Sequence, residues 1–486
     1  MCDLDTAVKL ARTENVDPRL FAPPITSHLR LIIVKKQLVS GDDLSFLLLK
    51  LLHDTIEDVS ECTKYFTSLA LKANEVGASF DSEIQHVEMI PEGIRKQNFV
   101  SKYKLDWFLA QSLLGYSKSG EKTCEKLIES GVFLVLHNLR EKYENDNEML
   151  AVVAKIVSNL SKYPQSHQHF MSTGWIGILC NWLNSDSNVL ELKLAAAKCL
   201  YNLDRDIQFS LSDSVYLVSP MYRNKTVDCD IVFIHGLLGR VFRTWRQSDL
   251  CKNDQDYTRC WPLDWLSKDI SAIRIMAADY ETYLSDWRIE CPTEKLTLKD
   301  RGEYILQSLI AAGIGNRPII WIGHSMGGLL IKQILVACEE SNSPVLKEVL
   351  RNSKATVFYS VPHRGSELAT WPTIVYNVIL PSTEVKELMK DSPVLLSLQN
   401  KFLNIVRKRQ LHCISFAETL KSKLGAKKVK IKSLMVSKES ANLGYGEFHL
   451  LSTDHHSTCK PVNKNSDSYR LTLEFILDVI NNLNIS

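Results

Sequence analysis

The chain has 486 residues, of which 45% are hydrophobic and 23% charged, and its formal net charge at pH 7 is +2. A chain of this length is predicted to form two or three domains. Its net charge is too small to indicate a nucleic-acid partner. The 12 cysteines form no C-x-x-C pair and no Cys/His group at metal-ligand spacing. We therefore predict no metal site, no cofactor, and reduced thiols in an intracellular setting.

The N-terminus carries no recognisable targeting sequence. Its first residues, MCDLD, are acidic where a presequence is basic. The nearest candidates for a membrane span, at 46–52 and 319–322, are too short to cross a bilayer and are soon interrupted by Lys or His. We expect a soluble chain.

Residues 1 to about 205 are predicted to be helical. Apolar residues recur at helical spacing in 44–52 and 105–109, and no alternating strand pattern occurs. The sequence also repeats with an offset of 43 residues. The matching positions are Gly131 with Gly174, Ala154-Lys155 with Ala197-Lys198, and Asn159-Leu160 with Asn202-Leu203.

A period of this length is typical of armadillo and HEAT repeats, whose small residues let neighbouring helices approach closely. We predict armadillo-like helical repeats over 101–208, preceded by a helical region over 1–100 whose register is unclear. An irregular helical bundle with a chance internal match is the alternative.

Residues 213–486 change to short β-rich runs separated by helical stretches, which predicts an α/β-hydrolase type of domain with a mostly parallel sheet flanked by helices. Most of the expected strands are apolar throughout, as strands covered on both faces are. The expected strands are 215–218, 231–234, 272–276, 319–322, 356–359, 413–416 and 431–436. Examples of the expected helices are 300–312, 328–338 and 469–482.

The strand at 319–322 leads directly into the sequence GHSMGG at 323–328, and an apolar helical pattern follows. This order predicts a nucleophile elbow, in which Ser325 occupies a strained turn and Gly323 and Gly327 avoid steric clashes. The amides at the start of the following helix then face negative charge that develops on the substrate. A structural turn that merely contains serine is the alternative.

An oxyanion hole needs a second amide, which is expected after the strand at 231–234, where HGLLG follows. Gly236 lets the backbone pass close to the substrate. The amide of Leu237 or Leu238 then acts together with that of Met326. An ordinary glycine-containing turn is the alternative.

The catalytic base is expected after the last strand, because the triad of this fold has the chain order Ser, acid, His. His455 lies in the polar loop 452–458 and is the predicted base. Its neighbour His456 is the alternative. His412, at the start of an expected strand, is predicted to be structural.

The catalytic acid is expected just past a strand near the end of the sheet. Glu418 follows the strand at 413–416 and is the predicted acid, since a buried carboxylate orients the imidazole and stabilises its charged form. Asp391 and Glu439 are alternatives. An ordinary surface acid is the competing interpretation of Glu418.

Nine basic residues lie between 407 and 432, against one acid, Glu418. A basic rim beside the site attracts anionic phospholipid surfaces, and a solvated loop is the alternative. The residues named as anionic-lipid contacts are Arg407, Lys408, Arg409, Lys427 and Lys428.

The segment 371–398 lies where such folds often insert a lid. Four of its apolar residues either line an acyl channel or form the core of the lid. They are Trp371, Tyr376, Ile379 and Leu380.

Four stretches together resemble one lipase-like group of serine hydrolases. They are HGL at 235–237, GHSMGG at 323–328, VPHRGS at 361–366, and DHHSTCKP at 454–461. The group includes the serine-active-site-containing proteins of phosphatidylglycerol remodelling and the glycosylphosphatidylinositol inositol-deacylases. A helical repeat before the hydrolase matches the former in particular, so the resemblance covers essentially the whole chain.

The resemblance implies a serine acyl hydrolase or transacylase that acts on phosphatidylglycerol at a membrane surface. It further implies links to bis(monoacylglycero)phosphate, cholesterol trafficking, and contact sites between the mitochondrion and the endoplasmic reticulum. Proteins of this kind carry a hydrophobic N-terminal anchor, and this chain begins without one. We therefore expect either a shortened form or another route of membrane attachment.

The resemblance also allows a non-enzymatic scaffold, whose armadillo half binds and stabilises a membrane partner such as a mitochondrial serine carrier. The complete set of triad candidates favours chemistry, because a vestigial site usually loses a member. A fold by itself does not establish activity.

Overall fold

The computed structural model describes residues 3–21, 48–49, 52–53, 59–76, 101–185, 189–223, 225–280, 296–366, 383–424 and 431–485. They form two compact units, one ending at Asp213 and the other beginning at Ser214. Within the described ranges, no helix combines the length and the apolar character that crossing a bilayer requires.

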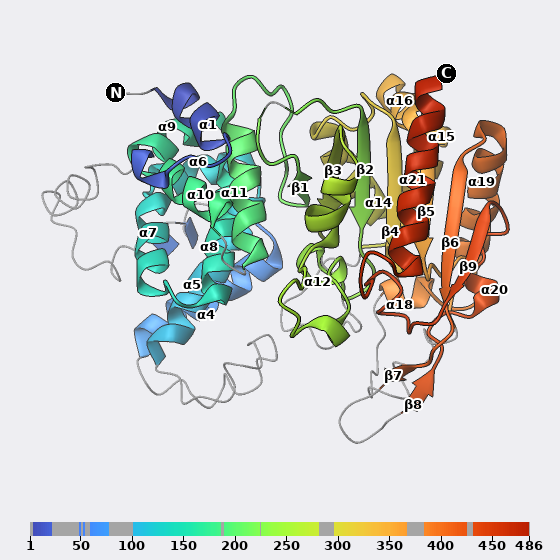
Figure 1. Cartoon of the computed structure of the whole chain (residues 1–486). Coiled ribbons are helices and arrows are strands. Elements are labelled where there is room, and N and C mark those ends of the chain that lie inside the picture. Colours follow the sequence, from blue (N-terminus) through green and yellow to red (C-terminus); the bar gives the residue numbers. More distant parts are fainter. Residues whose placement is uncertain are drawn as a thin grey trace, which may run out of the picture. The chain divides into compact units, whose positions relative to one another are not determined.

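The N-terminal unit is built of helices in the part that the structure describes (Figure 1). In chain order they are α1 (Leu4–Ala11), η1 (Pro18–Phe21), α4 (Glu61–Val76), α5 (Ser101–Lys118), α6 (Glu121–Glu129), α7 (Val132–Lys142), α8 (Asn147–Leu160), α9 (Pro164–Ser172), α10 (Trp175–Asn184) and α11 (Leu190–Leu203).

The sequence repeat coincides with two successive groups of three helices, α6–α7–α8 and α9–α10–α11. The middle helix of each group follows a glycine in the left-handed conformation, Gly131 with φ 86° and Gly174 with φ 78°. The last helix of each group carries an asparagine with an equivalent partner. Asn159 Nδ2 donates to Ser117 Oγ at 2.9 Å, and Asn202 Nδ2 donates to Ser161 Oγ at 3.1 Å.

The C-terminal unit contains a seven-stranded sheet in the order β1-β3-β2-β4-β5-β6-β9. The strand β1 is antiparallel to β3, and every other neighbouring pair is parallel, so the predicted mostly parallel sheet is confirmed. The strands are β1 (Val215–Ser219), β2 (Cys229–Ile234), β3 (Ile273–Ala278), β4 (Ile319–His324), β5 (Ser353–Tyr359), β6 (His412–Glu418) and β9 (Glu447–Leu451). All residues of β2, β3 and β4 are buried, which explains their continuous apolar sequences.

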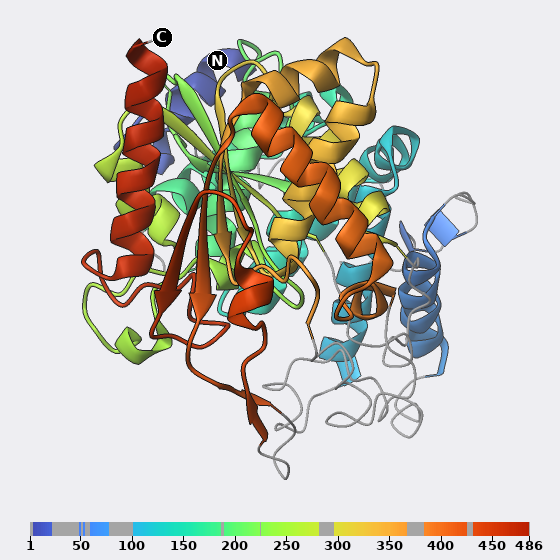
Figure 2. The ribbon, with the colours of Figure 1, turned by 90° about the vertical axis from the view of Figure 1, so that its right-hand side faces the viewer.

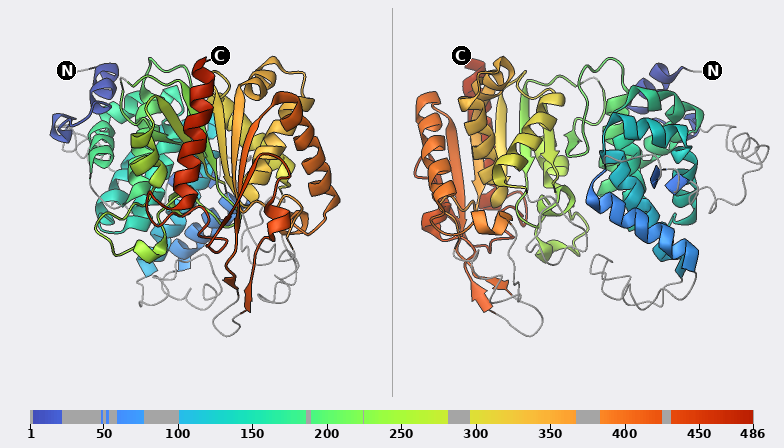
Figure 3. Two further views of the ribbon diagram at one scale, coloured as in Figure 1. Left: turned by 45° about the vertical axis from the view of Figure 1, so that its right-hand side comes forward. Right: turned by 180° about the vertical axis from the view of Figure 1, so that it is seen from behind.

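Helices cover both faces of this sheet (Figures 2 and 3). One face carries α14 (Leu298–Ala311), α15 (Met326–Glu340) and α19 (Pro393–Arg409), and α16 (Pro344–Asn352) packs beside α15. The other face carries α21 (Asp467–Ile485), whose Tyr469 ring contacts Trp261 and Trp265 at centroid distances of 5.6 and 5.3 Å. Within the described ranges, this unit also has the short helices α12 (Val241–Thr244), η5 (Asp249–Cys251), η6 (Pro262–Leu266), α13 (Ser267–Asp269), α18 (Thr383–Glu387) and α20 (Lys438–Ala441).

The prediction that 431–436 is a strand of the main sheet is wrong. The first three residues of this segment form β8 (Ile431–Ser433), which pairs with β7 (Ser422–Leu424) in a separate two-stranded sheet, and residues 434–436 belong to no strand. The seventh strand of the main sheet is β9. It lies at the edge, and its side chains before Leu451 are exposed or half-buried, so it lacks the apolar run that marks a central strand.

The strand order reverses at β2 and β4, because the chain passes from β2 to β3 on one side and then returns to β4 on the other. In sheets of this kind ligands bind at the carboxyl ends of the two strands that flank such a reversal. Ile234, the last residue of β2, pairs with Gly323 near the end of β4. The loops that follow these two strands, which begin at His235 and Ser325, therefore emerge side by side.

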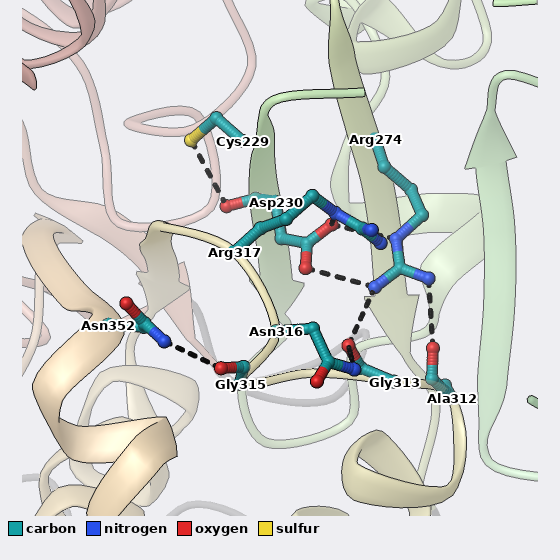
Figure 4. Close-up of polar contacts among 9 residues, drawn as sticks. All are labelled: Cys229, Asp230, Arg274, Ala312, Gly313, Gly315, Asn316, Arg317 and Asn352. Atoms are coloured by element: carbon teal, nitrogen blue, oxygen red, sulfur yellow. Dashed lines mark hydrogen bonds and ion pairs between the residues drawn. The ribbon is translucent and has the colours of Figure 1, made fainter. Parts of the chain in front are cut away.

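A buried ion pair joins β2 and β3 at the amino end of the strands (Figure 4). Arg274 donates to both carboxylate oxygens of Asp230, with Nε to Oδ1 at 2.7 Å and Nη2 to Oδ2 at 2.9 Å. The same guanidinium donates to the carbonyl oxygens of Ala312 at 2.9 Å and Gly313 at 3.3 Å. Arg317 Nε adds a contact of 3.4 Å to Oδ1. Hydrogen bonds on both partners offset the cost of removing the two charges from water.

Candidate active site

Ser325 connects β4 to α15 in a strained backbone conformation, with φ 53° and ψ −126°. Residues other than glycine rarely adopt a positive φ, and such strain occurs most often at functional positions. The two flanking glycines are required by close packing. A Cβ on Gly323 would lie 2.7 Å from Cα of Gly328, and a Cβ on Gly327 would overlap the carbonyl oxygen of Ile234. The turn therefore has the geometry of a nucleophile elbow.

His455 lies within hydrogen-bond distance of both side chains predicted to act with it. Its Nε2 is 3.1 Å from Oγ of Ser325, and its Nδ1 is 2.9 Å from Oε2 of Glu418. A carboxylate can only accept, so Nδ1 carries the proton and Nε2 is free to accept the serine hydroxyl. In this tautomer the imidazole can take the proton of Ser325.

Glu418 ends β6 as a buried carboxylate. Its Oε1 accepts hydrogen bonds from the amides of Met435 at 2.7 Å and Val436 at 2.9 Å. Burial by itself raises the pKa of Glu418, but the charge and hydrogen bond of His455, with the backbone hydrogen bonds, hold that pKa below its ordinary value. The ionised carboxylate can orient His455 and stabilise its cationic form.

The alternative candidates lie apart from these contacts. His456 is exposed, and its ring centroid is 5.6 Å from that of His455. His412 is the exposed first residue of β6. Asp391 and Glu439 are both exposed acids, and the carboxylate that contacts Nδ1 of His455 is that of Glu418.

The loop after β2 passes directly beside the serine. A Cβ on Gly236 would lie 2.7 Å from Cβ of Ser325 and 2.9 Å from the carbonyl oxygen of His324, so only glycine fits this position. Leu237 is the residue after Gly236, which packs against Ser325. Met326 is the first residue of α15. The first amides of a helix have no partner within the helix and carry its positive dipole end. The two predicted oxyanion donors therefore belong to segments that border Ser325.

We expect Glu418→Gln to lower acyl turnover by roughly 10⁴-fold, because a side-chain amide can donate to Nδ1 and thereby favour the wrong tautomer of His455. The measurement is the rate of ester hydrolysis at saturating substrate. Glu439→Gln is the matched control and should leave the rate unchanged. A loss confined to the Glu439 variant would move the acid role to that residue.

A buried polar group on α15 was not expected from the sequence. Lys332 is fully buried. Its Nζ donates to Oε1 of Gln399 and lies 3.3 Å from Nδ1 of His363. In the part of the chain that the structure describes, Lys332 has no acidic partner, and burial lowers its pKa from 10.5 to about 7. The sequence feature that indicates this buried group is a lysine within the apolar helical run LLIKQIL at 329–335.

This lowered pKa predicts a pH-dependent stability. The unfolded chain keeps the Lys332 proton up to about pH 10.5, and the folded protein releases it above about pH 7. Between these values the unfolded state binds more protons, so the free energy of unfolding rises with pH across this window. Below about pH 7 the amine is charged in the folded protein, and the full cost of burying this charge lowers the free energy of unfolding.

We expect Lys332→Met to raise the free energy of unfolding at pH 6.5 by roughly 2 kcal/mol, because the removed charge cost exceeds the two lost hydrogen bonds. At pH 10 the same variant should be less stable than the wild type. Urea unfolding at both pH values measures this. Lys401→Met, at an exposed lysine on α19, is the control and should show no such reversal. A Lys332→Met effect that is equal at both pH values would contradict the lowered pKa.

The prediction of a basic rim beside the site is wrong for three of the residues that it names. Arg407, Lys408 and Arg409 end α19 just before β6 begins. They therefore lie at the amino end of a seven-residue strand whose carboxyl end carries Glu418. Such a strand spans roughly 20 Å. The cause of the error is that residues close in sequence can lie at opposite ends of one strand.

Two of these cations also have partners of their own, since Glu339 contacts Lys408 at 2.6 Å and Arg409 at 3.0 Å. The other predicted lipid contacts, Lys427 and Lys428, lie outside the described residues. The same holds for the four apolar residues of the expected lid, Trp371, Tyr376, Ile379 and Leu380.

The chain is similar to known proteins along nearly its whole length, although no protein-family model matches it. Protein SERAC1 of Danio rerio is 36% identical over 495 residues, which cover 98% of this chain and 72% of that protein. Protein SERAC1 of Homo sapiens is 34% identical over 500 residues, which cover 99% of this chain and 73% of that protein.

Among solved structures, the mature lipase BlEst2 of Bacillus licheniformis superimposes on 55% of this chain and 97% of its own, at 15% identity and a TM-score of 0.36. The identity of 36% to a SERAC1 protein over 98% of the chain decides its relationship: the chain belongs to the SERAC1 family, the lipase-like group that its four motifs resemble.

Proposed function

We propose that the C-terminal unit is a serine-dependent lipid acyl hydrolase or transacylase, with Ser325 as nucleophile, His455 as general base and Glu418 as the orienting acid. The observation that supports it most strongly is the chain of two hydrogen bonds at 3.1 and 2.9 Å that links these side chains. A strained serine at the start of a buried helix, at the point where the strand order reverses, supports it as well.

In the first step Oγ of Ser325 attacks the ester carbonyl carbon while Nε2 of His455 takes the hydroxyl proton. The amides of Leu237 and Met326 stabilise the negative charge on the carbonyl oxygen. The ester bond then breaks, the leaving alcohol takes the proton from His455, and the acyl group remains on Ser325. Glu418 stays ionised and stabilises the imidazolium throughout.

In the second step a hydroxyl compound attacks the acyl-serine, again giving its proton to His455. Water as the acceptor yields a fatty acid, and a lipid hydroxyl yields a transacylated lipid. The proposed substrate is phosphatidylglycerol at a membrane surface, and the proposed setting is the mitochondrion and its contact sites with the endoplasmic reticulum, with an effect on intracellular cholesterol trafficking. These finer assignments rest on the resemblance of the four motifs.

The proposed domain organisation is a helical region over 1–100, armadillo-like repeats over 101–208 and an α/β-hydrolase domain over 213–486. The two groups of three helices, with a left-handed glycine at the same place in each, support the repeat assignment. The equivalent asparagine–serine bonds of the two groups support it too.

A second candidate function is a scaffold that binds and stabilises a membrane partner, such as a mitochondrial serine carrier, through the armadillo half. The observation that favours it is that the proposed triad and oxyanion residues all come from the unit that begins at Ser214. The proposed chemistry therefore uses no residue of the helical unit, which is available for binding a partner.

Labelling of the full chain with a fluorophosphonate probe tests enzyme against scaffold. The wild type and Ser452→Ala, which alters an exposed serine in the loop of His455, should both be labelled. Ser325→Ala should not be labelled. A folded wild type that remains unlabelled would remove the enzyme proposal and leave the scaffold.

Vesicles of phosphatidylglycerol and of phosphatidylcholine then test the substrate class. Acyl release or transfer should be faster from phosphatidylglycerol. Equal rates would remove this substrate while leaving a serine hydrolase.

A further inference from the structure

His324, the residue before the nucleophile, contacts the loop that carries the base. It is the last residue of β4 and is buried. Its Nε2 lies 3.0 Å from the backbone carbonyl oxygen of His455, and the two rings are tilted by 46° with centroids 5.0 Å apart. A carbonyl oxygen can only accept a hydrogen bond. Nε2 of His324 therefore carries a proton and is the donor of this bond.

The backbone of His455 is held on both sides of the residue. Its amide donates to Oγ of Ser422 at 3.3 Å. Its carbonyl oxygen accepts from His324 and also from Oγ1 of Thr458 at 3.0 Å. Of these three partners, only His324 is covalently joined to Ser325. The contacts therefore close a ring that runs from Ser325 through His324 to the carbonyl of His455, and from the imidazole of His455 back to Oγ.

The imidazole of His324 is expected to be uncharged when it donates this hydrogen bond. Burial lowers the pKa of His324 well below its ordinary value, and the neighbouring His455 lowers it further. The other titratable groups that oppose a charge there are His456 and Lys460. The neutral imidazole has a single N–H group, and the carbonyl oxygen of His455 holds that group at Nε2. A neutral His324 also places no positive charge against the imidazolium that forms during the reaction.

We propose that His324 is a positioning residue, which ties the loop of His455 to the nucleophile elbow and so keeps Nε2 of His455 within reach of Oγ of Ser325. This inference rests on the proposed function of the triad. His324 does not touch the substrate in this proposal. Its loss should therefore lower kcat and leave KM nearly unchanged, because the interaction matters for proton transfer rather than for substrate binding.

Three variants of the full chain test the proposal. His324→Leu removes the donor while keeping an apolar side chain in the space, and kcat should fall by about 10²-fold, the loss that a displacement of about 1 Å can cause. His324→Gln retains an N–H donor of similar reach and should recover most of that loss. His456→Leu changes the exposed histidine next to the base and is the matched control, with kcat close to that of the wild type. Ester hydrolysis gives kcat and KM, and the melting temperature checks the fold.

Two results would overturn the proposal. One is a folded His324→Leu with the wild-type kcat. The other is a folded His324→Gln as slow as the leucine variant, since the hydrogen bond would then not be the important property. If His324→Leu does not fold, His324→Asn takes its place, and its shorter side chain should make it slower than His324→Gln. A wild type that fluorophosphonate does not label is a different result, because it removes the proposed function itself.

Discussion

Replacing His455 by alanine should lower acyl turnover by roughly 10⁶-fold, the size of effect expected when a serine hydrolase loses its base. Without the base at 3.1 Å, the hydroxyl of Ser325 keeps its proton and remains a poor nucleophile. The double variant Ser325→Ala/His455→Ala should be no slower than either single variant, because the two residues act as one unit. Single-turnover hydrolysis of a fluorogenic ester measures the rates.

His449→Ala is the matched control for this experiment. His449 lies on β9, and its ring contacts Glu447 at 3.1 Å rather than the triad. Turnover by this variant should stay within a few fold of the wild type. Losses that add in the double variant would show that Ser325 and His455 act independently and would contradict the triad.

Removal of the buried carboxylate at the amino end of the sheet should have the largest effect on stability. We expect Asp230→Ala to lower the free energy of unfolding by about 3–5 kcal/mol, since it leaves the buried guanidinium of Arg274 without its negative partner. The side chains of both residues are almost fully buried, with exposed fractions of 0% and 5%. Urea-induced unfolding measures the change.

Asp228→Ala, at an exposed acid two residues earlier, is the control and should be nearly neutral. The double variant Asp230→Leu/Arg274→Met should be less destabilised than Asp230→Ala, because the fully buried guanidinium is removed together with its partner and the remaining cation, Arg317, is partly exposed. The labelling rate of Ser325 per folded molecule should not change, since this ion pair lies at the opposite end of β2 from the site. An Asp230→Ala protein as stable as the wild type would mean that the pair contributes little.

The sequence by itself determined the features that depend on local backbone geometry and on order along the chain. A strained turn between a buried strand and a helix requires glycine on either side of Ser325, so the elbow is visible in the pattern GHSMGG. The order of Ser325, Glu418 and His455 pointed to the side chains that the structure brings together. The central strands were visible because residues buried on both faces are apolar throughout.

Only the tertiary structure decided which side chains meet across the sheet and at which end of a strand they lie. The edge strand β9 has no apolar run, and Arg407 to Arg409 lie at the amino rather than the carboxyl end of β6. The partners of Lys332 lie 31 and 67 positions away, and the partner of His324 lies 131 positions away. Contacts of this range follow from strand order and helix packing. No pattern within a few residues records them, because the physical reason for each lies in a distant part of the chain.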